Sequence, residues 1–289
     1  MSEQSAQYAW PDNYRSAVAL SFDLDAESVI LAVDRAYAER PSVMTHQAYG
    51  PITGLPRLLE ILLEAGYRAT FFIPGFTADR YPGAVAAVLE AGHEVGHHGY
   101  LHRPPAHLSV EEERAELERG LEALAKHGVR PAGFRAPWWE ASRHTLGLLS
   151  EYGFVYDASL FDRDTPYTVT TAHGPIVEIP QSWALDDWER YAYMPDPPSG
   201  QGVIERPADV METWWQEIVA YREYGGCAVP VMHPFLSGRP ARAAALRELL
   251  ERLRSLPDVW VATLGDVADH TVRLGMDPIP LDLPDLESF

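Results

Sequence analysis

Two histidines and a distant carboxylate are the first chemical feature of this sequence. His98 and His102 are four residues apart, and Asp25 lies far upstream. Two imidazoles and one carboxylate form a ligand set for a divalent metal that leaves coordination positions open for water and substrate. The sequence therefore predicts a hydrolytic metal centre with Asp25, His98 and His102 as ligands.

A second carboxylate, Asp23, precedes Asp25 by two residues at the end of an apolar run. Side chains alternate between the two faces of a strand, so these two carboxylates share one face. From that position Asp23 can take a proton from a water molecule at the metal centre. We therefore expect Asp23 to act as the general base.

Other histidines crowd the same region, and spacing alone does not separate them. His97 is adjacent to His98, and His93 and His107 lie close by in the sequence. A His-x-x-x-His pair also occurs by chance in many sequences, so the acidic residues upstream carry most of the prediction. His97 stays open as an alternative ligand to His98.

The charge of the chain limits its partners. Its 289 residues include 23 basic and 42 acidic side chains, which gives a formal net charge of −19. Such a chain repels the phosphate backbone of nucleic acids and the surface of anionic membranes. We therefore expect neither nucleic acid nor membrane as a partner.

The cysteine content and the first residues favour a cytoplasmic enzyme. Cys227 is the only cysteine, so an intrachain disulfide cannot form. Residues 1–10 are polar without a positively charged n-region, and the first apolar run, 17–22, is too short for a signal-peptide core or a membrane span.

Predicted strands and helices alternate along the chain. Apolar runs typical of buried strands fall at 17–22, 69–73, 93–96, 134–135, 154–156, 177–179, 228–232 and 259–262, and helical patterns at 55–65, 82–91, 109–124, 145–152, 207–224 and 239–256. This alternation predicts a parallel sheet closed into a barrel within one domain. Residues 26–51 lack a sustained period, so we expect a long loop or short helix over the site.

The candidate chemical residues follow predicted strands, at the edge where barrels place their active sites. These residues are the aspartates, the histidine cluster, the segment 135–139 and His233. Arg135 ends an apolar strand beside two tryptophans, so we expect it to pair with a carboxylate, either Asp23 or Asp157.

Residues 160–201 are rich in aspartate, proline and aromatic side chains, and we interpret them as a substrate-facing insertion. Trp138, Trp139 and Trp183 together indicate a flat apolar slot for a small planar ring. The aromatic content of the insertion also predicts that it packs against another subunit.

Five motifs resemble, in this order, those of the polysaccharide deacetylase family, also called the NodB homology family. They are Phe22-Asp23-Leu24-Asp25, His98-Gly99-Tyr100-Leu101-His102, Arg135-Ala136-Pro137-Trp138-Trp139, Tyr156-Asp157 and Val231-Met232-His233-Pro234. The resemblance covers roughly residues 16–269. It implies a distorted (β/α) barrel and a divalent metal, zinc first, with cobalt, manganese or nickel as alternatives.

The resemblance also implies a role for each matching residue. Asp25, His98 and His102 would be the metal ligands, and Asp23 the base. Arg135 would orient the base, and His233 would be the general acid. Asp157 or Asp162 would supply the acidic residue of the fourth motif.

Within that family the chain is similar to a soluble branch that includes a peptidoglycan-deacetylase-like protein and bacterial cyclic imide hydrolases. Residues 91–96, 136–140 and 156–160 carry this likeness. The usual Asp-Asp of the first motif is Asp-Leu-Asp here, as in the imidase-like branch. Metal-free allantoinase-like relatives lack the second histidine, whereas His102 is present, which favours a metal.

Together these features predict a metal-dependent hydrolase of a non-peptide C–N bond in a small cyclic imide or cyclic amide. The alternative is removal of an acetyl group from an amino sugar, a chitooligosaccharide or a peptidoglycan-type substrate. Related soluble enzymes resemble tetramers, so we expect a tetramer or dimer. The expected organisation is an amino-terminal segment (1–15), the barrel (16–270) with its insertion, and a carboxy-terminal tail (271–289).

Overall fold

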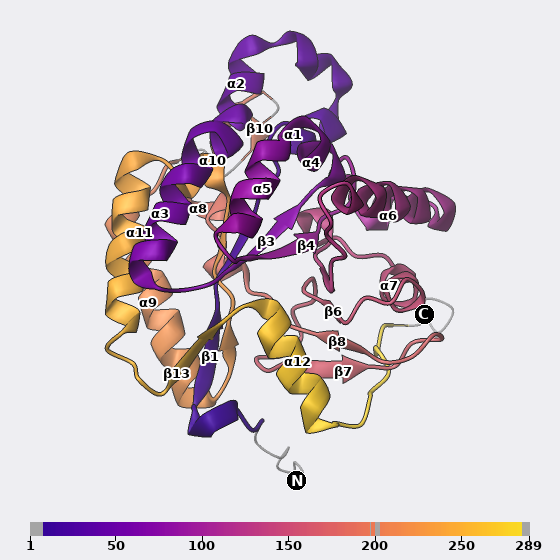
Figure 1. Cartoon of the computed structure of the whole chain (residues 1–289), viewed down its shortest axis with the longest axis vertical. Coiled ribbons are helices and arrows are strands. Elements are labelled where there is room, and N and C mark those ends of the chain that lie inside the picture. Colours follow the sequence, from indigo (N-terminus) through magenta and orange to yellow (C-terminus); the bar gives the residue numbers. More distant parts are fainter. Residues whose placement is uncertain (1–7, 197, 200–202, 285–289) are drawn as a thin grey trace.

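The computed structural model describes residues 8–196, 198–199 and 203–284 (Figure 1). Short strands form the centre of the molecule, and the longer helices lie outside them. The α/β class and the distorted barrel expected from the sequence are confirmed. In the described ranges, no helix has both the length and the apolar character needed to cross a membrane.

The first strand is split between two sheets. β1 (Ser16–Ala19) pairs in parallel with β11 (Cys227–Ala228) and β13 (Val259–Ala262). After Leu20 the chain continues as β2 (Ser21–Asp23), which pairs in parallel with β12 (Val231–Met232) and β3 (Thr70–Ile73). The residues of both strands are buried, as expected for a parallel strand covered on both faces. The split places the end of β2 between β3 and β12, and β12 leads directly into His233.

The larger sheet has eight strands in the order β12-β2-β3-β4-β5-β6-β8-β7. Its further strands are β4 (Glu94–His97), β5 (Gly133–Phe134), β6 (Tyr156–Asp157), β8 (Ile176–Glu178) and β7 (Tyr167–Val169). β7 pairs antiparallel with β8, while the other neighbours in this sheet pair in parallel. β7 and β12 are the edges of the sheet, so the barrel is open rather than closed.

The helices connect these strands. They are α1 (Ser28–Val33), α2 (Pro41–Tyr49), α3 (Leu55–Ala65), α4 (Gly75–Arg80), α5 (Pro82–Glu90), α6 (Val110–Ala125), α7 (Thr145–Glu151), α8 (Trp188–Tyr191), α9 (Pro207–Tyr224), α10 (Pro234–Ser237), α11 (Pro240–Leu253) and α12 (Leu264–Leu274). Single-turn helices occur at Pro11–Asn13, Arg35–Glu39, Gly50–Gly54, Pro105–His107, Pro137–Trp139 and Trp183–Leu185. A short antiparallel hairpin joins β9 (Met194–Pro195) to β10 (Pro198–Ser199).

Local sequence signals explain several helix ends. α6 begins with a capping box, in which Ser109 and Glu112 each accept a hydrogen bond from the backbone N–H of the other. Thr263 and Asp266 form the same motif at α12, a helix that was not expected. The predicted boundary at residue 270 therefore falls inside α12, which packs on β1, β7 and β8.

Residues 26–51 are more regular than the sequence indicated. They form α1, a single-turn helix and α2, which lies at the top of Figure 1. The pattern gave no clear period because α2 buries few of its side chains, among them Val43 and Gln47.

Candidate active site

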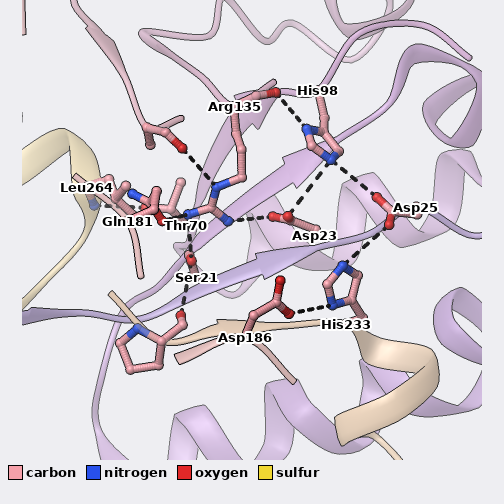
Figure 2. Close-up of polar contacts among 12 residues, drawn as sticks. Ser21, Asp23, Asp25, Thr70, His98, Arg135, Gln181, Asp186, His233 and Leu264 are labelled. Atoms are coloured by element: carbon pink, nitrogen blue, oxygen red, sulfur yellow. Dashed lines mark hydrogen bonds and ion pairs between the residues drawn. The ribbon is translucent and has the colours of Figure 1, made fainter. Parts of the chain in front are cut away.

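The end of β2 places two carboxylates at the centre of the predicted site. Asp23 and Asp25 are both buried, and Figure 2 shows Asp25 between the rings of His98 and His233. Neither carboxylate oxygen of Asp25 accepts a hydrogen bond. A buried anion without hydrogen bonds is costly, so it needs a cation beside it.

Two histidines face this carboxylate at distances too long for hydrogen bonds. His98 Nε2 lies 3.5 Å from Asp25 Oδ1, and His102 Nε2 lies 3.6 Å from Asp25 Oδ2. His98 Nδ1 bonds to the carbonyl oxygen of Arg135 at 2.7 Å, so Nδ1 carries the proton and Nε2 turns its lone pair toward Asp25. Burial lowers the pKa of His98 to about 3 and that of His102 well below its ordinary value, so both rings are neutral.

These residues fit a divalent metal. The ligand atoms of Asp25, His98 and His102 lie within 4.8 Å of one another, and all three side chains are buried. Burial and the neighbouring carboxylates, opposed by the charge of His233, raise the pKa of Asp25 to about 7, whereas a metal cation would favour its ionised form. His102 also has a positive φ of 59°, a strained backbone that is typical of functional positions.

The alternative ligand His97 is excluded by its own contacts. Its Nε2 bonds to the carbonyl oxygen of Leu117 at 3.0 Å, and its Nδ1 accepts from the N–H of Gly99 at 3.1 Å. Both ring nitrogens are therefore occupied within the fold. His107 is exposed, and His93 Nδ1 accepts from the N–H of Ala69 at 3.3 Å.

Arg135 fixes the orientation of Asp23. Its Nη1 donates to Asp23 Oδ1 at 2.6 Å, while its Nη2 donates to Ser21 Oγ at 3.0 Å and to Gln181 Oε1 at 3.1 Å. The guanidinium is fully buried and lies over the ring of Phe72 at 4.3 Å. Of the two carboxylates expected to pair with Arg135, the hydrogen-bonded partner is Asp23. Its other oxygen lies 3.8 Å from His98 Nε2, so Asp23 borders the metal position.

His233 lies on the opposite side of Asp25, at the start of α10. Its Nε2 is 3.5 Å from Asp25 Oδ2, and its Nδ1 is 2.7 Å from Asp187 Oδ1. Asp187 also accepts from the backbone N–H of His233 and from the hydroxyl of Ser237. Burial opposes the charged ring, but the hydrogen bond and charge of Asp187, with Asp186 and Asp25 nearby, raise the pKa of His233 to about 10.

The carboxylate that contacts His233 is Asp187 rather than either residue expected from the sequence. Sequence alone pointed to Asp157 or Asp162 as the acidic residue of the fourth motif, and each has its contacts elsewhere. Asp157 is buried beside Glu178, and Asp162 is half exposed and accepts from the hydroxyl of Tyr167 at 2.7 Å. The acidic pair Asp186-Asp187 directly before Trp188 was the available signal.

The pocket above these residues is small and aromatic. It encloses about 440 Å³ including its mouth, and Trp138, Trp139 and Trp183 are among the residues that line it. Trp188 is a fourth aromatic wall, with its ring 5.0 Å from that of Trp138. Asp186 and Glu189 add carboxylates to the lining.

A second group of possible ligands lies beside the first. Asp186, Asp187 and His233 also bring ligand atoms within 4.8 Å of one another. In this group the Nδ1–H of His233 already donates a hydrogen bond to Asp187. This nitrogen therefore has no free lone pair with which to bind a metal. The group containing Asp25 is therefore the better metal site.

Comparisons with known proteins identify relatives of this chain. A family model described as polysaccharide deacetylase matches residues 17–156. The crystal structure of a putative polysaccharide deacetylase from Mycobacterium smegmatis is 49% identical, with a TM-score of 0.95 over 98% of this chain and 99% of that one. A peptidoglycan deacetylase of Helicobacter pylori is 29% identical over 283 residues, covering 89% of this chain and 96% of that protein. PuuE allantoinase, 24% identical over 92% of this chain and 93% of that one, has a TM-score of 0.81 and shows a shared fold.

The two aspartates of β2 should respond differently to the same substitution. Asp25→Asn should weaken zinc binding at least tenfold, because it removes an anionic ligand. Asp23→Asn should retain the metal and lower the turnover of succinimide or of an N-acetylated sugar by roughly 10² to 10⁴, the usual contribution of a general base. Metal content after dialysis and steady-state kinetics measure both effects. Equal metal loss in the two variants would contradict the assignment.

Asp187→Asn should impair turnover while leaving the metal in place. The amide keeps the shape of the carboxylate but cannot stabilise a protonated His233, so we expect a loss of roughly 10² to 10⁴ in kcat. Asp162→Asn is the matched control, because Asp162 is half exposed and accepts its hydrogen bond from Tyr167 rather than from His233. Wild-type turnover in Asp187→Asn, or a comparable loss in Asp162→Asn, would contradict the role of Asp187 as the acidic partner of His233.

Proposed function

The chain belongs to the polysaccharide deacetylase family, and on that premise we propose that it hydrolyses a C–N bond in a small cyclic imide or cyclic amide. Membership identifies it as a hydrolase of carbon–nitrogen bonds other than peptide bonds, in a family of metal-dependent enzymes. The substrate class and the choice of zinc are the parts that we propose.

The observation that carries this proposal is the shape of the pocket. Four tryptophans line the pocket, and aromatic walls on several sides suit a small flat ring more than several sugar units. Aromatic walls favour planar ligands because ring faces and edges pack closely. The polar groups at the base of the pocket are those that hydrolysis requires, namely Asp23, Asp25 and His233.

Asp25, His98 and His102 would hold the metal, and Asp23 would serve as base. A bound divalent ion lowers the pKa of water and polarises an acyl oxygen. Asp23 accepts the proton of the attacking water, and Arg135 keeps its carboxylate aimed at that position. Because Arg135 is itself fixed by Ser21 and Gln181, Asp23 needs little reorganisation during the reaction.

His233 would protonate the leaving nitrogen. Its Nδ1 donates to Asp187, which leaves the Nε2–H directed toward Asp25 and the pocket. A raised pKa keeps this ring protonated at neutral pH, so the acid is ready before the substrate binds. Asp23 and His233 then act as base and acid from opposite sides of the metal position.

A second candidate is removal of an acetyl group from an amino sugar or a related glycan. The names of the relatives in Helicobacter pylori and Mycobacterium smegmatis favour it. The reaction also cleaves an amide C–N bond, so the same residues would perform it. The two candidates differ in substrate access rather than in chemistry.

Purified, zinc-loaded protein should distinguish the two candidates. We expect kcat/KM for succinimide or hydantoin to exceed that for a chitin oligomer by roughly 100-fold, because the tryptophan walls exclude a chain of sugars. Asp23→Asn is the control for contaminating activity. A preference for the oligomer would overturn the imide proposal and support the deacetylase.

We also propose that the aromatic insertion mediates self-association. Trp183 and Tyr193 are 46% and 49% exposed, and Phe161 stacks on Trp183 with ring centroids 5.3 Å apart. Residues 197, 200 and 201 of the predicted insertion lie outside the described residues. The expected cytoplasmic location stays a prediction.

Light scattering should give the mass of a dimer or tetramer, and Phe161→Asp should lower that mass by placing a charge in the contact. Tyr224→Asp is the control, because Tyr224 is more exposed but lies at the end of α9 rather than in the insertion. A monomeric wild type across the concentration range would contradict this proposal.

A further inference from the structure

Two carboxyl groups are buried behind the site and have no part in the mechanism above. Asp157 and Glu178 lie opposite each other in the parallel register of β6 and β8, and both are fully buried. One oxygen of each, Asp157 Oδ2 and Glu178 Oε2, has no hydrogen-bond partner. Two neighbouring carboxylates in a buried site cannot both be ionised without a large cost.

The remaining oxygens of the two groups bind one short loop. Glu178 Oε1 accepts from the backbone N–H of Ser159 at 3.1 Å and of Leu160 at 2.9 Å. Asp157 Oδ1 accepts from the hydroxyl of Ser159 at 2.8 Å. The same hydroxyl oxygen accepts from the N–H of Ala136 at 2.8 Å. The two carboxyl groups are therefore connected through Ser159 to the wall of the catalytic pocket.

Ala136 lies in the segment 135–139, which carries several site groups. Arg135 precedes it and holds Asp23, and the carbonyl oxygen of Arg135 bonds to His98. Trp138 and Trp139 follow, with positive φ angles of 59° and 54°. Such strained backbone persists only where the surrounding structure holds it in place.

We propose that Asp157 and Glu178 share one proton between their facing oxygens, and that this acid pair positions the segment 135–139 for catalysis. Glu178 donates from Oε2 to Asp157 Oδ2, so each unpartnered oxygen gains a partner. Hydroxide would remove this proton as water and leave two facing anions. Asp157 is then a positioning residue rather than the acidic partner of His233. The effect on turnover rests on the proposed function, whereas the shared proton does not.

The surrounding charges agree with a proton held at neutral pH. Burial, with the neighbouring charge of Asp157, raises the pKa of Glu178 well above its ordinary range. Burial also raises the pKa of Asp157 to about 6, although its hydrogen bonds and the charge of Arg135, at the end of β5, oppose this shift. Tyr167 faces Glu178 across the β7 register, and its own pKa is raised by burial and by its hydrogen bond to Asp162.

The helices packed on β8 direct their charged groups elsewhere. On α7, Glu151 pairs with Arg114 at 2.8 Å. On α12, Asp266 pairs with Arg68 at 2.6 Å, and His270 bonds to the carbonyl oxygen of Ala9 at 2.6 Å. Asp269 and Arg273 complete the charged groups of α12, and Asp269 is exposed.

The shared proton predicts a specific pH dependence of stability. The unfolded chain loses the proton of Glu178 near the ordinary pKa of about 4.3, whereas the folded chain retains it. Above a pH of about 4.3 the folded state binds more protons than the unfolded state. The free energy of unfolding therefore falls as pH rises from this value to the pKa of the pair. Glu178→Gln replaces the carboxylic acid with an amide that donates to Asp157, accepts from Ser159 and Leu160, and does not titrate.

Thermal melting of the full chain between pH 5 and pH 9 tests the shared proton. Wild-type Tm should fall by roughly 2 °C per pH unit more than that of Glu178→Gln. Asp157→Asn should flatten the curve by the same amount, because either amide removes the same proton. Glu248→Gln, an exposed glutamate on α11, is the matched control and should follow the wild type. Parallel curves for wild type, Glu178→Gln and Asp157→Asn would overturn the shared proton.

Turnover of succinimide tests the positioning role. Glu178→Ala should lower kcat roughly tenfold by loosening the segment 135–139, and Glu178→Gln should restore it. The ratio of Glu178→Gln to wild-type kcat should increase at alkaline pH. Equal kcat in Glu178→Ala and wild type would overturn the positioning role. If the wild type hydrolyses no imide, the proposed function fails, while the melting curves still decide the shared proton.

Discussion

The structure depends on one electrostatic constraint, the burial of Asp25 between two neutral imidazoles. Its oxygens accept no hydrogen bond, and the ring nitrogens of His98, His233 and His102 are 3.5, 3.5 and 3.6 Å away. An ionised carboxylate in this setting is stable only with a cation in contact with it. The hydrogen bond from His98 Nδ1 to a backbone carbonyl directs a lone pair to the same place. The site is therefore organised to bind a metal before any substrate is present.

The groups on each side of that position are held by different means. Arg135 brings a full positive charge to Asp23, while Asp187 brings a full negative charge to His233. The first pair favours a carboxylate that accepts protons, and the second favours an imidazole that donates them. Both pairs are buried, where such charges interact more strongly than in water. The fold thus places a charge of the opposite sign beside the proposed base and beside the proposed acid.

Sequence alone predicted the features that depend on local patterns. The helix Pro207–Tyr224 and the strand Val259–Ala262 have the bounds that their apolar spacing indicated. The ligand candidates also followed from residue type and strand position, and the structure brings them together. Contacts between segments that are distant in the sequence could not be predicted from local patterns. Asp187 is 46 residues from His233, and its role appears only when α8 and α10 meet over the pocket. Asp157 ends a strand as a catalytic residue would, but its strand register pairs it with Glu178.

The most direct test of the metal site is anomalous X-ray diffraction from crystals loaded with zinc. A single strong peak should lie about 2.0 to 2.2 Å from Asp25, His98 and His102, the usual range for zinc bound to nitrogen and oxygen. A peak instead at Asp186, Asp187 and His233, the neighbouring group of possible ligands, would contradict the assignment of ligands and of the general acid.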